Sequence, residues 1–267
     1  MVTAKTRLDQ RNVTGGTVDG YRRPMEIEGR NAVVTGGAVR VGRAICTALA
    51  DAGVNVFIHY NRSAGPAEDL AGELADRDVT IAVGSADLSD PGTAGDLIRR
   101  ASAELGPISI LVNSASGFPE DSIDDVTIDA VRATHDLTLA SPLFLTQAFA
   151  AALPEDAQGA VVNITDVKTL TPYRKHLSYM LAKGGVDTLT RAAAIGLAPR
   201  IRVNAVALGV ILPPPGEDES YVDERARELP LQRVGGAEVV ADTVVFLARN
   251  DFITGEIIRL DGGAHLT

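Results

Sequence analysis

Three polar residues in the second half of the chain have types and a spacing suited to proton transfer. Tyr179 and Lys183 are four residues apart in a segment predicted to be helical, so both side chains leave the same face. An ammonium beside a phenol favours the phenolate, so we expect Lys183 to lower the Tyr179 pKa from its usual value of about 10. Asp166 follows the apolar run 160–165 at the carboxyl end of a predicted strand, where open α/β sheets place their ligands. A lone Tyr/Lys pair is also common on ordinary helices, so the proton-transfer interpretation depends on the rest of the chain.

Strands and helices that alternate from Asn31 onward must position these groups. The strand segments are almost continuously apolar, which is typical of a parallel sheet covered by helices on both faces. We therefore predict one α/β domain over residues 29–267, a doubly wound Rossmann-type fold with a mostly parallel seven-stranded sheet. The expected strands are 31–35, 54–60, 79–84, 108–113, 160–165, 201–207 and 256–260, and the expected helices are 40–51, 67–75, 91–105, 128–153 with a bend at Pro142, a helix that contains Tyr179 and ends near 197, and 238–248.

Residues 1–28 differ from the rest of the chain. They are polar and aperiodic, and they lack the apolar segment of a secretory signal. We predict a flexible N-terminal extension here, with little bearing on function.

Composition narrows the classes of partner. The net charge of the 267 residues is −10 and no basic run is present, which argues against nucleic acid or an anionic membrane as a partner. No stretch approaches the ~18–20 apolar residues that span a bilayer. Cys46 is the only cysteine, so no intrachain disulfide can form, and we expect a buried core residue in a cytoplasmic protein. The expected ligand is a small molecule, and we predict no metal site.

The first predicted strand-to-helix turn, VVTGGAVRVG at 33–42, is rich in glycine. Gly36, Gly37 and Gly42 would let the backbone approach a phosphate at the start of the next helix, where N–H groups and the dipole favour anions. The pattern is TGxxxRxG, with Arg40 where the commoner pattern has glycine. At the start of a strand–helix array, this turn indicates a dinucleotide site.

The end of the second predicted strand indicates which dinucleotide. Proteins that bind NAD usually have an acidic residue here for the ribose hydroxyls, whereas this chain has the sequence HYNRS at 59–63. Arg62 and Arg40 could converge on a 2′-phosphate, and Ser63 could donate to it. These residues favour NADPH over NADH, although Arg62 could also be an ordinary solvated residue. We interpret His59 as structural.

Six spaced motifs resemble those of the short-chain dehydrogenase/reductase family, over about residues 30–265. Within the family, the sequence is most similar to pteridine reductases, because of TGxxxRxG, HYxRS, the stretch from Asn113 to Phe118, and Asp166 where most members have serine. The motifs are TGGAVRVG (35–42), DL (87–88), NSAS (113–116), YMLAK (179–183), VNAVALG (203–209) and DGG (261–263).

The resemblance implies roles for individual residues. Tyr179 would be the proton donor, Lys183 would bind the nicotinamide ribose, and Phe118 would stack on a flat heterocycle. It also implies a homotetramer. The predicted catalytic residues are Asp166, Tyr179 and Lys183; the predicted NADPH contacts are Gly36, Arg40, Val41, Asn61, Arg62, Ser63, Asp87, Leu88, Asn113, Ala115, Tyr179, Lys183, Gly209 and Ile211; and the predicted substrate contacts are Ser116, Phe118, Asp166, His176 and Tyr179.

Asp166 bears on the type of bond that is reduced. A serine hydroxyl can donate to a carbonyl at any pH, whereas a carboxylate would oppose the oxyanion formed in carbonyl reduction. An aspartate suits a substrate that is protonated at nitrogen, and it could act as a neutral acid if burial raises its pKa. Lys183 would act in the opposite direction, so both signs of the shift stay open. We predict reduction of a C=N bond in a pterin-like or other cyclic imine.

Several positions depart from the family pattern. Thr138 stands where a helix asparagine usually supports a water chain to the lysine, and Leu208 replaces the usual proline. Ser114 stands where a second asparagine is usual, and Pro213 lies where a hydroxyl often holds the carboxamide. These changes leave room for specialised chemistry.

A proline-rich, acidic segment at 210–233 follows the sixth predicted strand. Such a segment usually closes over the nicotinamide and excludes water. His176, three residues before Tyr179, could contact the substrate at the mouth of the site or lie exposed in a loop.

Three interpretations follow from these residues. An NADPH-dependent C=N reductase is favoured by Asp166, Phe118 and Arg40. A 3-oxoacyl or ketone reductase would use Tyr179 and Lys183 equally well, but Asp166 does not suit it. A non-catalytic dinucleotide-binding protein is opposed by the intact Tyr179/Lys183 pair, and fold alone does not separate the three.

Overall fold

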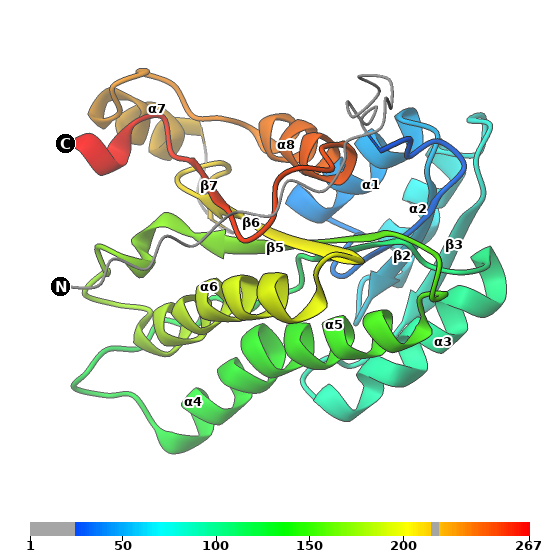
Figure 1. Ribbon diagram of the computed structural model, residues 1–267. Coiled ribbons are helices and arrows are strands. Elements are labelled where there is room, and N and C mark those ends of the chain that lie inside the picture. Colours follow the sequence, from blue (N-terminus) through cyan, green and yellow to red (C-terminus); the bar gives the residue numbers. More distant parts are fainter. Residues whose placement is uncertain (1–24, 215–218) are drawn as a thin grey trace, which may run out of the picture.

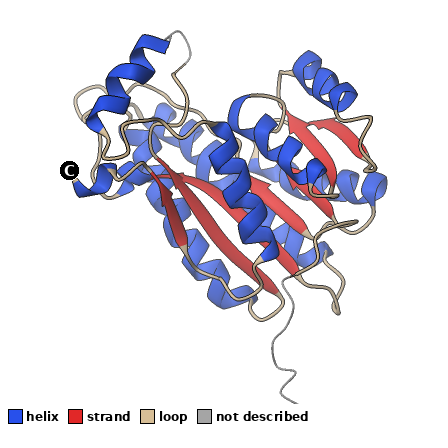
Figure 2. Cartoon of the chain, turned by 90° about the horizontal axis from the view of Figure 1, so that it is seen from above, coloured by secondary structure: helices blue, strands red, loops and turns tan. Residues whose placement is uncertain are grey.

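Parallel strands form one sheet in the computed structural model, which describes residues 25–214 and 219–267. In chain order they are β1 (Asn31–Val34), β2 (Asn55–Tyr60), β3 (Ile81–Ser85), β4 (Ile110–Asn113), β5 (Gly159–Asp166), β6 (Ile201–Leu208) and β7 (Ile257–Leu260). Their order across the sheet is β3-β2-β1-β4-β5-β6-β7, and every neighbouring pair is parallel (Figure 2). The predicted seven-stranded Rossmann-type fold is confirmed, and the sheet is parallel throughout.

Helices cover both faces of this sheet (Figure 1). On one face lie α1 (Arg40–Asp51), α2 (Ala64–Glu73) and α8 (Ala237–Arg249), and on the other lie α3 (Ala94–Leu105), α5 (Ser141–Ala152) and α6 (Leu177–Leu197). Strands β1 to β6 therefore each supply apolar side chains to two cores. In β1, Ala32 and Val34 pack on the α1 and α8 side, whereas Val33 packs on the α3 and α5 side. This two-sided burial explains the nearly continuous apolar strands.

The segment predicted as one helix over 128–153 is divided in the structure. It consists of α4 (Ile128–His135), a π-helical turn (Asp136–Ala140) and α5. Pro142 lies in the first turn of α5, where a missing N–H costs no intrahelical bond. The wider π turn precedes the proline, and Thr138 within it is buried. The prediction of a single helix bent at Pro142 is therefore wrong, because the helix is interrupted by a π-helical turn before the proline.

The folded domain includes residues of the expected N-terminal extension. Met25 and Ile27 are buried, and the Met25 N–H donates to the Arg249 carbonyl at the end of α8 at 2.8 Å. The domain thus begins by residue 25, four residues before the boundary predicted from sequence, whereas residues 1–24 lie outside the described part.

The segment predicted as a loop at 210–233 contains α7 (Glu219–Glu228). This helix lies beside the C-terminal end of the chain, away from the sheet layers (Figure 1). Its charged residues give no apolar face that sequence periodicity could reveal. Among the described residues, no helix has the length and apolarity needed to cross a bilayer.

Candidate active site

The carboxyl end of β5 and one face of α6 bring the candidate proton-transfer groups together. Asp166 is the last residue of β5, and the Tyr179 hydroxyl donates to its Oδ2 at 3.1 Å. The other carboxylate oxygen accepts the Lys168 N–H at 2.8 Å, which fixes the orientation of Asp166. Both Asp166 and Tyr179 are buried. Their hydrogen bond joins the strand end to the helix at one point.

Lys183 lies one turn farther along α6 and is also buried. Its ammonium donates to the Ile164 carbonyl at 2.7 Å and lies 5.6 Å from the centre of the Tyr179 ring. On the same helix face, Asp187 accepts a hydrogen bond from Thr165 Oγ1 at 2.7 Å. Burial lowers the pKa of Lys183 to about 8, against the pull of Asp166 and Asp187. The lysine is thus held against β5 by backbone and acidic neighbours.

The pKa of Tyr179 is shifted in the direction opposite to the one predicted from its spacing to Lys183. Burial raises the pKa of Tyr179 well above its usual value, and the adjacent Asp166 acts in the same direction. Burial also raises the pKa of Asp166, and this effect outweighs the Lys168 N–H, Tyr179 and Lys183, which all favour the carboxylate. The predicted lowering of the Tyr179 pKa by Lys183 is wrong for this arrangement. Both pKa shifts favour the protonated form of each group.

Aromatic rings line the approach to this pair. Phe118 stacks on His176, with ring centres 3.7 Å apart and planes at 17°, and its ring makes an edge contact with Tyr179 at 4.8 Å. Phe118 is half exposed. His176 is partly buried in the left-handed region at the start of α6, so it is not a freely solvated loop residue. His176 therefore supports Phe118 beside the tyrosine.

Tyr173, which we did not predict, belongs to the same group of rings. Its ring lies 5.9 Å from that of His176, and Lys168 lies over it at 5.4 Å. Burial, then Asp166, then Tyr221 of α7 raise its pKa to about 12. The position of Tyr173 between Asp166 and Tyr179 in sequence was a signal that could have revealed it. α7 thus borders the site from the 210–233 segment.

A buried carboxylate ties the loop after β4 to α6. Asp121 accepts a hydrogen bond from the Ser178 N–H at 2.9 Å and another from the Ser178 hydroxyl, directly before Tyr179 in sequence. It satisfies a helix N-terminal donor in the manner of a cap. Asp121 and Ser178 are 57 residues apart in sequence, so no local pattern indicates their pairing.

Ser116 and Thr138 lie on the same side of the site. The Ser116 hydroxyl donates to the Gly117 carbonyl at 3.1 Å and lies 3.5 Å from Thr138 Oγ1. Ser116 is exposed, whereas Thr138 is buried in the π turn. The threonine therefore packs beneath the loop that carries Ser116 and Phe118.

The glycine-rich turn is tightly packed around Gly36 and Gly42. Gly36 has a φ of +65°, and a Cβ there would lie 3.1 Å from Ala115 Cα. A Cβ on Gly42 would lie 2.1 Å from the Gly36 carbonyl oxygen. The turn thus brings the start of α1 close to the end of β4. The first N–H groups of α1, from Arg40 and Val41 onward, have no intrahelical acceptor and are suited to an anion.

Arg40 occupies a backbone conformation that favours glycine. Its φ is +53°, a conformation that costs a residue other than glycine roughly 1 kcal/mol or more. This explains why glycine is commoner at this position. Its guanidinium donates to the Pro213 carbonyl at 2.8 Å. Arg40 thus joins the turn to the segment after β6, and its convergence with Arg62 on a 2′-phosphate stays a prediction.

The residues after β2 and β3 lie at the surface. Asn61 and Arg62 are exposed and Ser63 is partly buried, and the Asn61 amide donates to Asp87 Oδ1 at 3.3 Å. Hydrogen bonds from Ser89 lower the pKa of the exposed Asp87, and Arg62 also contributes. The two strand ends are thus coupled by polar side chains around Asp87.

The remaining predicted cofactor contacts are more buried. The side-chain amide nitrogen of Asn113 donates to Asn163 Oδ1 at 2.8 Å. The side-chain oxygen of Asn113, Oδ1, is buried without a partner in the described structure. Ala115 N–H donates to Thr35 Oγ1 at 3.0 Å. Leu88 and Ile211 are core residues, and Gly209 packs directly against Asp261.

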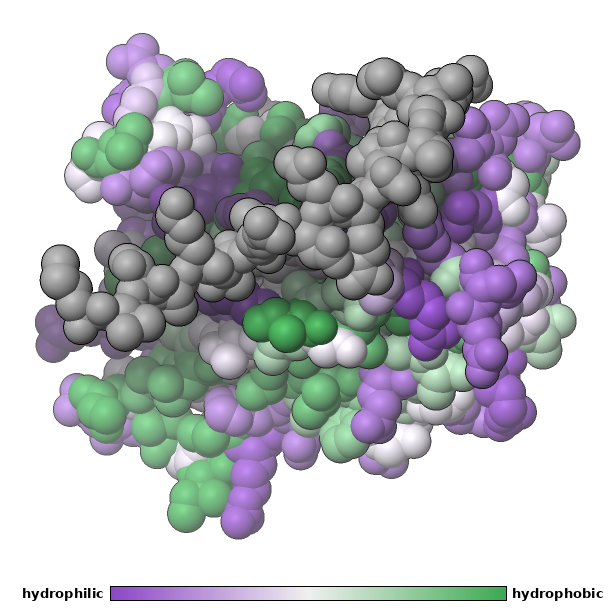
Figure 3. Space-filling view, in the orientation of Figure 1, coloured by the Kyte–Doolittle hydropathy of each residue, from purple (hydrophilic) through white to green (hydrophobic). Residues whose placement is uncertain are grey.

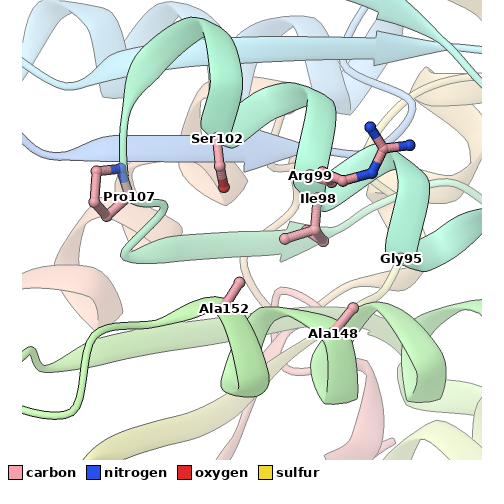
Figure 4. Close-up of a pocket in the computed structure, with 7 residues that line it drawn as sticks. All are labelled: Gly95, Ile98, Arg99, Ser102, Pro107, Ala148 and Ala152. Carbon is pink, nitrogen blue, oxygen red and sulfur yellow. The ribbon is translucent and has the colours of Figure 1, made fainter.

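The described structure has a groove elsewhere that does not contain these residues. It encloses about 320 Å³ between α3 and α5 and is lined mostly by small side chains (Figure 4). Arg99 and Ser102 are its polar residues. None of the candidate catalytic groups faces it, so we place the active site at the carboxyl ends of β1, β4 and β5.

This edge of the sheet fits a dinucleotide. The turn before α1 brings backbone N–H groups to one place, exposed polar residues follow β2, and the candidate proton-transfer pair joins the end of β5 to α6. Ligands of open parallel sheets bind where the strand order reverses, here between β1 and β4. The arrangement can hold a nucleotide at one end and transfer a proton at the other.

Comparisons with known proteins agree with this geometry. The family model described as Enoyl-(Acyl carrier protein) reductase matches residues 37–265. Pteridine reductase 1 from Leishmania tarentolae is 35% identical over 278 residues, which cover 88% of this chain and 96% of the relative. The 3-oxoacyl-(acyl-carrier-protein) reductase FabG of Staphylococcus epidermidis is 29% identical over 252 residues, which cover 89% of this chain and 99% of the relative.

A solved structure is similar over nearly the same span. FolM alternative dihydrofolate reductase 1 from Brucella canis, which was crystallised with NADP, is 38% identical with a TM-score of 0.86. The match covers 91% of this chain and 96% of that chain. From the family model, the relatives and this structure, we conclude that the chain belongs to the short-chain dehydrogenase/reductase family of oxidoreductases.

Proposed function

We propose that this chain is an NADPH-dependent reductase that adds hydride to a C=N bond of a pterin-like or other cyclic imine. The observation that carries the proposal is the buried hydrogen bond between Tyr179 and Asp166 at 3.1 Å. Both groups hold protons more strongly than usual, and an aspartate there suits protonation of nitrogen better than stabilisation of an oxyanion. The similarity to a pteridine reductase and to FolM supports the same class of substrate.

NADPH would be held by the edge of the sheet described above. The α1 N-terminus would receive the phosphates, and Arg62 with Ser63 would receive the 2′-phosphate. The absence of an acidic residue at 59–63 favours NADPH over NADH, and similar proteins were crystallised with NADP or NADPH. Bound NADPH supplies the hydride that forms the new C–H bond.

The protein's own groups would supply the proton. The Tyr179 hydroxyl would give its proton to the substrate nitrogen as the C=N bond becomes a C–N single bond, and Asp166 would return a proton to the tyrosine. Lys183 would carry the compensating positive charge beside the pair. Phe118, supported by His176, would position a flat ring against the tyrosine. α7 would exclude water from this step.

Carbonyl reduction is the second candidate. Tyr179 and Lys183 would serve a ketone or 3-oxoacyl substrate as well as an imine, and the similarity to FabG supports this alternative. The acid at position 166 favours it less, because it lacks the permanent hydroxyl donor of a serine and, whenever it is ionised, its negative charge would destabilise a developing oxyanion. A non-catalytic dinucleotide-binding protein would need neither Asp166 nor Tyr179 in this geometry.

Parallel assays would separate these candidates. We would follow NADPH oxidation with a dihydropterin, a cyclic imine and a 3-oxoacyl thioester, with NADH as a comparison cofactor. Turnover of the pterin or imine alone supports C=N reduction. Turnover of the thioester alone selects carbonyl reduction, and NADPH binding without turnover of any substrate selects the non-catalytic protein.

We also propose a homotetramer in the cytoplasm. Large apolar side chains are exposed along two neighbouring helices, Leu143 and Phe144 on α5 and Leu181 and Ile195 on α6. Figure 3 shows hydrophobic residues gathered on the side of the molecule that carries α4 to α6. Contact with another copy would bury them. Light scattering should give four times the chain mass of 27.9 kDa, and a monomer would contradict this assembly.

A further inference from the structure

His59, at the end of β2, holds the two glycines that open the cofactor-side turn. The Gly36 N–H donates to His59 Nδ1 at 3.2 Å, and the Gly37 N–H donates to the His59 carbonyl at 2.9 Å. Both glycine donors are therefore used within the protein. A phosphate would instead meet the free N–H groups at the start of α1, whose place depends on the turn.

The other edge of the imidazole reaches the end of β3. His59 Nε2 lies 3.1 Å from the Ala86 carbonyl oxygen. Because the Gly36 N–H needs an acceptor, Nδ1 must be unprotonated, and the ring proton must lie on Nε2 and be donated to Ala86. Ala86 directly precedes Asp87. One side chain thus joins the glycine-rich turn to the segment that carries Asp87.

Burial keeps this imidazole neutral. His59 is 2% exposed, and burial lowers its pKa to about 4, with Arg100 of α3 acting in the same direction against the Ala86 hydrogen bond. A protonated ring would place a donor opposite the Gly36 N–H. Because the side chain is covered, its hydrogen bonds act on a ligand indirectly, through Gly36 and Ala86.

We propose that His59 is a positioning residue for NADPH, whose ring fixes the glycine-rich turn relative to the end of β3. This inference rests on the proposed use of NADPH. It differs from a purely structural role, because a buried strand residue that only stabilises the domain changes the unfolding temperature without changing dinucleotide affinity. Matched substitutions can separate the two roles.

Asparagine and glutamine can each reproduce one of the two hydrogen bonds of the His59 ring. In His59→Asn, the amide oxygen can take the position of Nδ1 and accept from Gly36, but nothing reaches Ala86. In His59→Gln, the amide nitrogen can take the position of Nε2 and donate to Ala86, but the acceptor for Gly36 is lost. Val56→Ala is the control, because it removes buried apolar contacts in the same strand without touching the turn.

The experiment measures NADPH dissociation constants by fluorescence titration and unfolding temperatures without NADPH. We expect His59→Asn to bind NADPH within about threefold of wild type and His59→Gln to bind about tenfold more weakly, the worth of one buried hydrogen bond. Val56→Ala should unfold at a lower temperature and bind NADPH like wild type. Turnover at saturating NADPH should change less than affinity in both His59 variants.

Wild-type affinity in both His59 variants would overturn the positioning role alone. An equal loss of affinity in Val56→Ala would also overturn it, since the loss would then follow stability. A wild-type protein that does not bind NADPH would overturn the proposed function and this role together. The amide pair is conservative in size, so the comparison does not depend on a variant that removes the side chain entirely.

Discussion

The two ends of the candidate site differ in how they use burial. At the ends of β2 and β3, the side chains of Asn61, Arg62 and Asp87 are exposed, so water and salt screen their charges. At the end of β5, Asp166 and Tyr179 are buried, and desolvation is the largest influence on the pKa of each. Sequence motifs point to both ends. The direction of a pKa shift, however, can be inferred from the neighbouring residue types only at the exposed end.

Removing the tyrosine hydroxyl should have the largest effect and should be confined to the buried end. Tyr179→Phe removes the proposed proton donor, so turnover should fall by about 10² to 10⁴ while NADPH affinity stays close to wild type. Tyr173→Phe is the matched control, because Tyr173 borders the site without bonding to Asp166. Steady-state kinetics and NADPH titration measure both. Similar losses in the two variants would contradict the assignment of Tyr179.

Removing the exposed arginine should affect only the nucleotide end. Arg62→Ala should weaken NADPH binding about 10- to 100-fold, because a charge-assisted contact to the 2′-phosphate is lost. NADH binding should not change, since NADH lacks that phosphate. Arg99→Ala, on α3 beside Asp96, is the control and should leave both affinities unchanged. Equal weakening of NADPH and NADH in Arg62→Ala would show that Arg62 does not read the phosphate.

The pH dependence of turnover should report the buried end. Burial raises the pKa of Asp166, so the carboxyl stays protonated to a higher pH than an exposed aspartate. If the protonated acid is needed, turnover at saturating NADPH is full below this pKa and falls as the pH rises through it, about tenfold per pH unit. Asp166→Asn should abolish this limb of the profile. A limb that persists in the variant belongs to another group.

The stability of the protein should depend on pH in the opposite direction, through His59. Its pKa is lowered from 6.5 to about 4 in the folded protein, so the unfolded chain binds the proton more tightly. The free energy of unfolding should therefore fall as the pH drops from 6.5 toward 4, by up to about 3 kcal/mol. Urea unfolding of wild type and His59→Asn measures it, and the variant should show a smaller dependence. Equal slopes would mean that His59 does not titrate in this range.

Much of the fold could be predicted because local patterns and the sheet agree. Apolar strand runs such as 160–165 are buried on both faces, so their hydrophobicity alone indicates a parallel sheet. The division of 128–153 was not predictable, because the change to a π turn interrupts neither helical propensity nor apolar content. α7 was missed for a different reason, since its charged residues show no apolar period.

At the candidate site, the sequence predicted that certain residues lie together, but it did not predict the contacts that hold them. The spacing of Tyr179 and Lys183 correctly places both on one buried face of α6. It does not reveal that the Ile164 carbonyl holds the ammonium, or that Asp166 contacts the phenol. Both contacts depend on the approach of β5 to α6, as does the sign of the Tyr179 shift.

The central claim is that the buried acid at position 166 directs the chemistry to a C=N bond. The most direct measurement is kcat/KM for a cyclic imine and for a ketone, in wild type and in Asp166→Ser, with NADPH saturating. A serine can donate to a carbonyl but cannot supply a titrating proton to nitrogen. We predict that the imine-to-ketone ratio falls at least about tenfold in Asp166→Ser. An unchanged ratio would contradict the account.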